Sequence, residues 1–152
     1  MGITLANFFD GNNGWQQSPQ GLADLNDAAK KAAREGVFRL LPNMLGLVGN
    51  PTVILEKKDG QNDVLLFTLN DYQVRLHISP AGEVVKRAYR STSGFFQGDI
   101  EESFTDFKDL GGVKAAYKVS ATLNGQKFQD AEMVEAKANT NPDKAKLAEK
   151  PK

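Results

Sequence analysis

Residues 73–78 read QVRLHI, so polar and apolar side chains alternate strictly along this stretch. Because successive side chains of a strand point to opposite faces, Val74, Leu76 and Ile78 would share one face. The polar residues between them would share the other. A period of two is typical of an antiparallel strand with one buried and one solvated face. The stretch therefore predicts a sheet that buries one side.

Short turn sequences punctuate the chain on both sides of this strand. Combinations of Asp, Asn, Ser, Pro and Gly occur at 10–14, 59–62, 79–82, 97–99, 109–112 and 124–125. Turns at such short intervals, with β-branched and aromatic residues between them, favour β-hairpins. We expect strands at 52–58, 63–70, 72–79, 83–91, 99–108, 113–123 and 126–137, preceded by a hairpin that joins 3–9 to 14–18.

One segment has a different period. Between Leu22 and Val48, apolar residues recur every three or four positions, as on the buried side of an amphipathic helix. Asp24 or Asp27 can serve near its start. Gly36 weakens a helix and Pro42 lacks a backbone donor, so the segment is expected to form two consecutive or kinked pieces.

Aromatic residues fall on nearly every predicted strand, and one flat sheet cannot cover all of them. The predicted fold class is therefore mainly β with α: a curved antiparallel sheet, or half-barrel, packed on one helical segment. The large apolar residues then form an ordinary core, or they line a cleft between sheet and helix that takes an apolar ligand. The candidate cleft residues are Trp15, Leu40, Met44, Phe67, Leu76, Tyr89, Phe104 and Tyr117.

Composition excludes several classes of function. The 152 residues carry 19 basic and 19 acidic side chains, no Cys and one His. A chain without net charge has no field that attracts nucleic acid, and one without Cys and with a single His cannot form a Cys-based zinc site or a thiol nucleophile. No cofactor and no metal are expected. No apolar stretch approaches the roughly 18 residues that span a bilayer, and the N-terminus has no secretory pattern.

The remaining candidates for chemistry are weak. His77 falls on the polar side of its strand without a neighbouring partner in the sequence, which indicates a surface or structural role rather than a general base. An acidic cluster is a candidate for an ion site, but strand alternation would point its members to opposite faces. Its members are Asp99, Glu101, Glu102, Asp106 and Asp109. No catalytic residue is assigned, and the chain is expected not to be an enzyme.

Three stretches carry a family resemblance: 9–15 (FDGNNGW), 83–90 (EVVKRAYR) and 101–114 (EESFTDFKDLGGVK). The last, followed by a strand and an Asn-Gly-Gln-Lys hairpin, resembles the closing part of bacterial LolA/LolB-like lipoprotein-carrier domains. The order of hairpin, helical segment and strand meander is also similar. Such domains occur at the C-terminal end of some periplasmic or secreted zinc peptidases of the pitrilysin/insulinase type, and the chain is similar to those appendages.

The resemblance implies a half-barrel domain over 1–138 that lacks the first strands of complete members, followed by a polar tail over 139–152. It implies a non-catalytic, periplasmic or secreted domain that binds an apolar ligand, a lipid or a lipoprotein. The alternative is an accessory interaction domain of a zinc peptidase whose catalytic region would lie upstream. The peptidase signature His-x-x-Glu-His cannot occur in a chain with one His.

A start within the domain would also leave a strand edge unpaired. Residues 3–9 contain no Lys, Arg, Glu or Pro, the residues that protect an exposed edge. The sequence therefore predicts that this edge pairs with a second copy of the chain.

Overall fold

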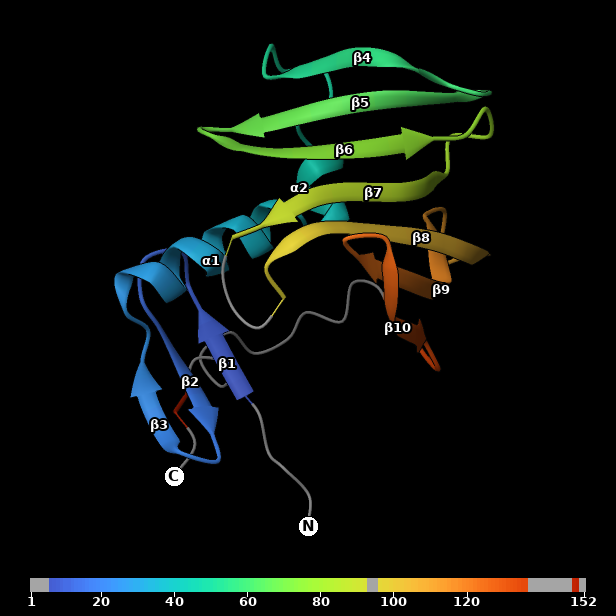
Figure 1. Cartoon of the computed structure of the whole chain (residues 1–152). Coiled ribbons are helices and arrows are strands. Elements are labelled where there is room, and N and C mark those ends of the chain that lie inside the picture. The colour runs from blue at the N-terminus through green and yellow to red at the C-terminus, as the bar shows by residue number, and fades with distance from the viewer. Residues whose placement is uncertain (1–5, 93–95, 137–148, 151–152) are drawn as a thin grey trace. The chain divides into compact units, whose positions relative to one another are not determined.

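The computed structural model describes residues 6–92, 96–136 and 149–150 (Figure 1). Contacts divide the chain into two compact units: Met1–Val37 with Asn139–Lys152, and Phe38–Ala138. The described part is mainly β, with one seven-stranded and one three-stranded antiparallel sheet and two short helices. The predicted antiparallel class is confirmed. The predicted tail at 139–152 lies outside the described residues except for 149 and 150.

The first unit contains a three-stranded sheet in the order β1-β2-β3. Its strands are β1 (Ala6–Phe9), β2 (Gly14–Ser18) and β3 (Gly21–Asp24). The Asp10 carboxylate closes the first turn by accepting the backbone N–H groups of Asn13 at 2.7 Å and Asn12 at 2.8 Å. These two bonds also lower the pKa of Asp10. The predicted N-terminal hairpin is confirmed for 6–9 and 14–18, while residues 3–5 lie outside the described part.

The third strand is a correction to the helix predicted from Leu22. Gly21 has a φ of +115°, which turns the chain back after β2, and Leu22 then pairs with Gln17. The spacing of Leu22 and Leu25 fits a helix, but the glycine conformation favours a hairpin at this point. The helical period therefore begins after the strand rather than at Leu22.

The helix α1 (Asp27–Phe38) begins with a different cap from those predicted. Asn26 Oδ1 accepts the backbone N–H of Ala29 at 2.9 Å, so Asn26 is the capping residue. Asp24 ends β3, and Asp27 lies in the first helical turn.

The second unit starts with an interruption of the helical segment. Leu40 is extended (φ −60°, ψ 125°), and the helix α2 (Leu41–Leu45) follows with Pro42 in its first turn. Proline fits there because the first N–H groups of a helix have no intrahelical acceptor. The predicted division into two helical pieces is confirmed.

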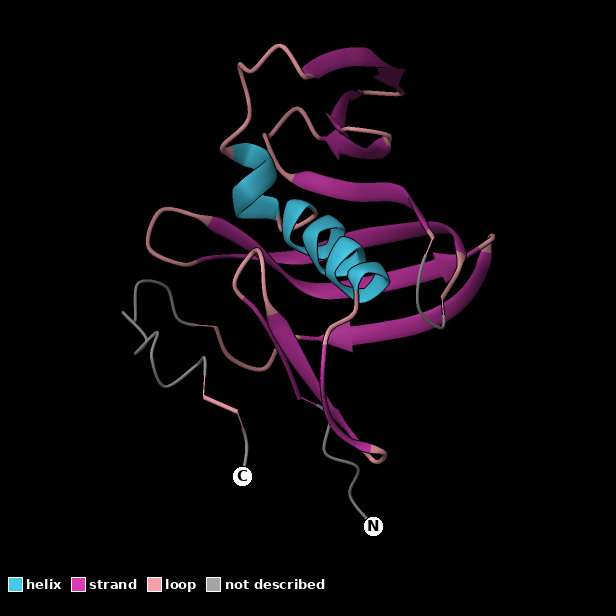
Figure 2. Ribbon diagram, turned by 90° about the vertical axis from the view of Figure 1, so that its left-hand side faces the viewer, coloured by secondary structure: helices cyan, strands magenta, loops and turns pink. Residues whose placement is uncertain are grey.

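Seven consecutive strands form the sheet of this unit, in the order β10-β9-β8-β7-β6-β5-β4, as labelled in Figure 1. Figure 2 draws the strands in magenta and the helices in cyan. They are β4 (Val53–Asp59), β5 (Asn62–Leu69), β6 (Tyr72–Ile78), β7 (Val84–Ser91), β8 (Gly98–Asp109), β9 (Lys114–Leu123) and β10 (Gln126–Glu132). Each strand pairs antiparallel with the next along the chain. The predicted meander is confirmed, although β10 ends at Glu132 rather than at 137.

The core of the second unit lies on one face of the sheet. Val74 and Leu76 of β6 and Phe67 of β5 are completely buried, as is Met44 of α2. Phe38, Tyr72, Val84 and Phe104 complete the buried cluster. The segment 38–48 therefore covers the apolar face that the alternation in 73–78 predicts.

A glycine and an asparagine fix the end of this sheet where β8 meets the β9–β10 turn. Gly98 has a φ of +139°, and a Cβ built on it would lie 2.5 Å from Asn124 Oδ1. That oxygen accepts the backbone N–H of Asp99 at 2.9 Å, while Asn124 N–H donates to the Asp99 carbonyl at 2.7 Å. No larger residue fits at position 98 without disturbing these bonds.

We expect Gly98→Ala to destabilise the chain more than Gly82→Ala. Both glycines have positive φ, but nothing lies within 4 Å of a Cβ at Gly82. The control therefore measures backbone strain alone, about 1 kcal/mol, while Gly98→Ala adds the collision with Asn124. Urea unfolding measures both, and equal losses would contradict the packing described here.

Candidate functional site

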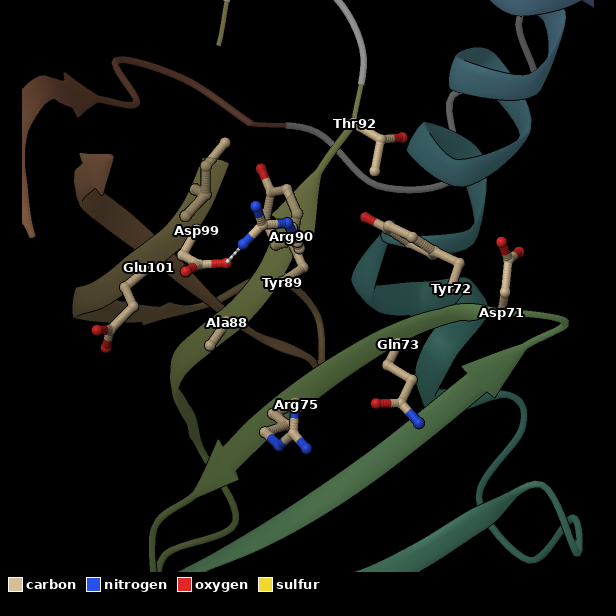
Figure 3. A pocket seen from close by; sticks show the side chains of 11 residues that line it. Asp71, Tyr72, Gln73, Arg75, Ala88, Tyr89, Arg90, Thr92, Asp99 and Glu101 are labelled. Carbon is tan, nitrogen blue, oxygen red and sulfur yellow. Dashed lines mark hydrogen bonds and ion pairs between the residues drawn. The ribbon is translucent and has the colours of Figure 1, made fainter. Parts of the chain in front are cut away.

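A hollow of about 440 Å³ opens where β6 begins, β7 ends and β8 begins. Figure 3 shows the side chains that line it. They are Asp71, Tyr72, Gln73, Arg75, Ala88, Tyr89, Arg90, Thr92, Asp99, Ile100 and Glu101. Among them, Tyr72 and Ile100 are buried, whereas most of the charged side chains are exposed. The charged residues are called its rim below.

Cross-strand ion pairs already neutralise the basic groups of this rim. Arg90 Nη1 lies 3.0 Å from Asp99 Oδ1, the contact dashed in Figure 3. Arg75 binds Glu56 through two bonds of 2.7 Å, which lower the pKa of Glu56 and raise that of Arg75. Because each guanidinium is paired with a carboxylate of another strand, the rim has no excess of positive charge.

A second cluster lies where Arg39, which precedes α2, meets two tyrosines of the sheet. The Arg39 guanidinium donates to the Tyr72 hydroxyl at 2.8 Å, and its carbon lies 4.5 Å from the centre of the Tyr89 ring. A cation over an aromatic face is attracted by the negative face of the ring. These contacts tie the half-buried Arg39 to the same tyrosines that line the hollow.

Arg87 and Glu102 form an ion pair on the apolar side of the sheet. Arg87 Nε donates to Glu102 Oε2 at 2.5 Å, and about 15% of each side chain is exposed. Arg87 Nη1 also donates to the backbone carbonyl of Arg39. Burial raises the pKa of the Tyr89 phenol, and the Glu102 charge adds to this effect. Arg39 and Arg87 act in the opposite direction.

His77 is buried, so of the two roles predicted for it, surface or structural, the surface position is wrong. It is 8% exposed, and its Nδ1 lies 3.1 Å from Asp59 Oδ2. Its register partners are Val64 and Lys86 on the adjacent strands. Burial, followed by the Lys86 charge, lowers the pKa of His77, while Asp59 partly opposes this shift. The contact with Asp59 was not predicted, because Asp59 belongs to β4, two strands away from His77 in the sheet.

The predicted acidic cluster is divided among separate contacts. Asp99, Glu101 and Glu102 face Arg90, Lys86 and Arg87 respectively. Asp106 lies 3.6 Å from Lys108, and Asp109 accepts the backbone N–H groups of Gly111 and Gly112. Within 6–92, 96–136 and 149–150, no three His, Cys, Asp or Glu residues form a group suited to a metal ion. These carboxylates are bound by basic groups and turns.

The predicted cleft residues fall into four places. Met44, Phe67, Leu76 and Phe104 are together in the core cluster, with Tyr89 packed against it. Leu40 is 54% exposed, and Tyr117 is buried under Lys108, whose Nζ lies 4.0 Å from the ring centre. Trp15 belongs to the first unit, where it stacks on Phe8 and lines a hollow of about 350 Å³. The structure thus brings together five of the eight.

The sequence analysis missed Arg39, Tyr72 and Arg87. One signal was present for Arg87: the alternation of β7 places it beside Leu76 on the apolar side, opposite Glu102 of β8. A charged pair at two facing apolar positions indicates a buried ion pair. Arg39 gives no such signal, because its neighbours depend on how the segment before α2 folds back.

Comparisons with protein-family models, curated proteins and solved structures found no match to this chain. No helix among the described residues is long and apolar enough to cross a membrane. The resemblance to lipoprotein-carrier domains therefore stays a prediction.

We expect His77 to make folding stability depend on pH below its ordinary pKa of 6.5. Because the folded state lowers this pKa, the unfolded chain binds the proton more readily. The stability that the neutral imidazole contributes is complete above pH 6.5 and is lost as the pH falls below it. In His77→Gln, the loss of stability between neutral and mildly acidic pH should be smaller than in the wild type.

The single imidazole makes this measurement direct, since only one histidine signal titrates in NMR. Lys86→Gln should raise the pKa of His77, because it removes a nearby positive charge. An unchanged titration in that variant, or equal acid sensitivity in His77→Gln and the wild type, would contradict the assignment.

Proposed function

We propose that this chain is a non-catalytic bacterial envelope domain that binds an apolar ligand, a lipid or a lipoprotein between the segment 38–48 and the seven-stranded sheet. The observation that carries the proposal is the two-sided apolar character of that segment. Met44 is completely buried on the inner side, while Leu40, Leu45 and Val48 are 54%, 46% and 58% exposed. Exposed apolar side chains gathered on one short segment are typical of an interaction site.

The packing inside supports the same proposal. The core beneath the segment contains Met44, whose unbranched side chain adapts to irregular spaces more easily than a branched one. A ligand that enters there would replace contacts of the segment with the sheet. Leu40 has an extended backbone conformation, and the helix α2 that follows it is only five residues long. Such a short helix depends on its packing for order.

The finer architecture and location belong to this proposal as well. A half-barrel with the helical segment on its concave side, and a periplasmic or secreted location, follow from the resemblance at 9–15, 83–90 and 101–114. The antiparallel meander and the helical segment at 38–48 agree with that arrangement.

The test compares two valine variants that differ in place. Val48→Asp puts a charge on the exposed segment, while Val113→Asp puts one in the β8–β9 turn, where Val113 is 64% exposed. We expect Val48→Asp to weaken binding of the fluorescent probe N-phenyl-1-naphthylamine roughly tenfold, since it replaces an apolar contact with a charge. Val113→Asp should bind like the wild type. Absence of saturable binding in the wild type, or equal loss in both variants, would overturn the proposal.

The alternative is an accessory interaction domain of a secreted or periplasmic zinc peptidase. It is favoured by the edge strand β4, where Ile54 is 51% and Leu55 is 61% exposed. An exposed apolar edge is a template for pairing with another chain. A His-x-x-Glu-His domain encoded directly upstream, together with failure of the probe to bind, would favour this alternative.

A second edge underlies the proposed homodimer. Among the described residues, β1 has a strand neighbour on one side only, and in register Asn7 lies opposite Gln16 of the central strand β2. We expect Asn7→Lys to shift sedimentation toward the monomer, because a lysine on an edge strand opposes strand addition. Gln16→Lys is the matched control on the same face of the sheet. A wild type that sediments as a monomer over the whole concentration series excludes the dimer.

A further inference from the structure

Arg39 is a half-buried cation without a carboxylate partner among the described residues. Its guanidinium donates to the Tyr72 hydroxyl at 2.8 Å and lies over the Tyr89 ring, and no ion pair joins it to a described Asp or Glu. Charged groups that lose part of their hydration are normally paired with an opposite charge. Arg39 therefore differs from Arg87, which lies nearby and is paired with Glu102.

The surroundings of Arg39 have an excess of positive charge. Two guanidinium groups face the Tyr89 ring, Arg39 at 4.5 Å and Arg87 at 6.0 Å from its centre. Glu102 accepts a hydrogen bond from Arg87 at 2.5 Å, so the negative charge of Glu102 compensates the positive charge of Arg87. Around the ring, one positive charge is left over.

Arginine in such a setting suits one kind of ligand group. A guanidinium presents several N–H donors in a rigid plane, which match the two oxygens of a carboxylate or the oxygens of a phosphate. Tyr72 contacts this guanidinium by a hydrogen bond, and Tyr89 contacts it by a cation–π interaction. Orientation by neighbours reduces the entropy that is lost when a ligand binds.

The exposed apolar side chains to which the proposed function assigns ligand binding follow Arg39 directly in the sequence. Leu40 follows Arg39 directly, and Leu45 and Val48 continue the exposed apolar series along the segment. A cation at one end of an apolar series fits a molecule with an anionic head and one hydrocarbon chain.

We infer that Arg39 binds the anionic head group of a single-chain amphiphile whose hydrocarbon chain lies along residues 40–48. This inference rests on the proposed function and narrows its ligand class to acidic amphiphiles, with either a carboxylate or a phosphate head. Tyr72 and Tyr89 act as positioning residues for the guanidinium.

The hollow beside the tyrosines does not suit the same head group. Its rim carries Asp71, Asp99 and Glu101, and its two arginines are bound to Asp99 and Glu56. An anion there would meet the unfavourable field of these carboxylates. Arg90 therefore provides a matched control: it is an arginine of the same unit that is paired and exposed.

The experiment measures binding of three ligands with the same twelve-carbon chain to the whole protein by calorimetry: dodecanoate, dodecyl phosphate and dodecanol. We expect at least one of the two anions to bind roughly tenfold more tightly than dodecanol, the effect of a charge-assisted hydrogen bond. Arg39→Gln should reduce this preference to about one while leaving the affinity for dodecanol unchanged. The stronger of the two anions identifies the head group as carboxylate or phosphate.

Two more variants separate a binding role from a structural one. Arg39→Lys keeps the charge but loses the planar fork, so it should retain part of the preference for the anion. Tyr72→Phe keeps the ring and removes the hydroxyl that orients Arg39, so the preference should fall by a smaller factor than in Arg39→Gln. Because the readout is a ratio between ligands of equal chain length, a general loss of packing does not imitate it.

The outcomes distinguish this inference from the proposed function. If none of the three ligands binds the wild type, the proposed function fails and the inference with it. If dodecanol binds as tightly as both anions, the proposed function stands and the inference is wrong. If Arg90→Gln rather than Arg39→Gln abolishes the preference, the head group lies in the hollow, and the assignment to Arg39 is overturned.

Discussion

The contact of Met44 with the apolar face of the sheet is the interaction on which the second unit depends. Met44 is the one completely buried residue of α2, and it meets Phe67 and Leu76, which are also completely buried. Burying such a side chain contributes about 1.5–3 kcal/mol. A five-residue helix has little stability of its own. The face of the sheet therefore orders the helix, rather than the reverse.

Arg87 adds directional hydrogen bonds to the apolar contact between the segment 38–48 and the sheet. Placing a guanidinium on the apolar side costs hydration, and Glu102 and the carbonyl of Arg39 compensate for it. Apolar contacts alone would allow the segment to slide over the sheet, because they are not directional. The bond from Arg87 to the Arg39 carbonyl holds the backbone before α2 against the sheet, while Tyr72 and Tyr89 contact the Arg39 side chain.

The sequence predicted the strands well because their signals are local. The alternation at 73–78 and the turn residues near 60, 80 and 111 depend on neighbours in the chain, so the meander followed from them. The start of the helix was wrong because Leu22 fits both a strand and a helix. Its conformation was decided by the turn at Gly21. Periodicity alone does not separate the two at such a short distance from a turn.

The candidate site was predicted less well, because its contacts are long-range. Met44, Phe67, Leu76 and Phe104 lie together in the core cluster, but the apolar character from which they were predicted as cleft residues is shared by any core residue. The pairing of His77 with Asp59 required the register of three strands, and the contact of Arg39 with Tyr72 joins residues 33 positions apart. A single sequence contains no local pattern for such contacts.

The two faces of the large sheet divide its chemical roles. On the polar face, cross-strand pairs such as Lys86 with Glu101 and Arg90 with Asp99 neutralise charge within the sheet itself. Pairs of this kind contribute little to stability, but they leave little net charge to attract a partner. On the other face, the segment 38–48 exposes apolar side chains and contains the half-buried Arg39, for which no ion pair with a described carboxylate is found. The exposed apolar side chains and Arg39 therefore belong to one short segment, and it is there that we propose the ligand binds.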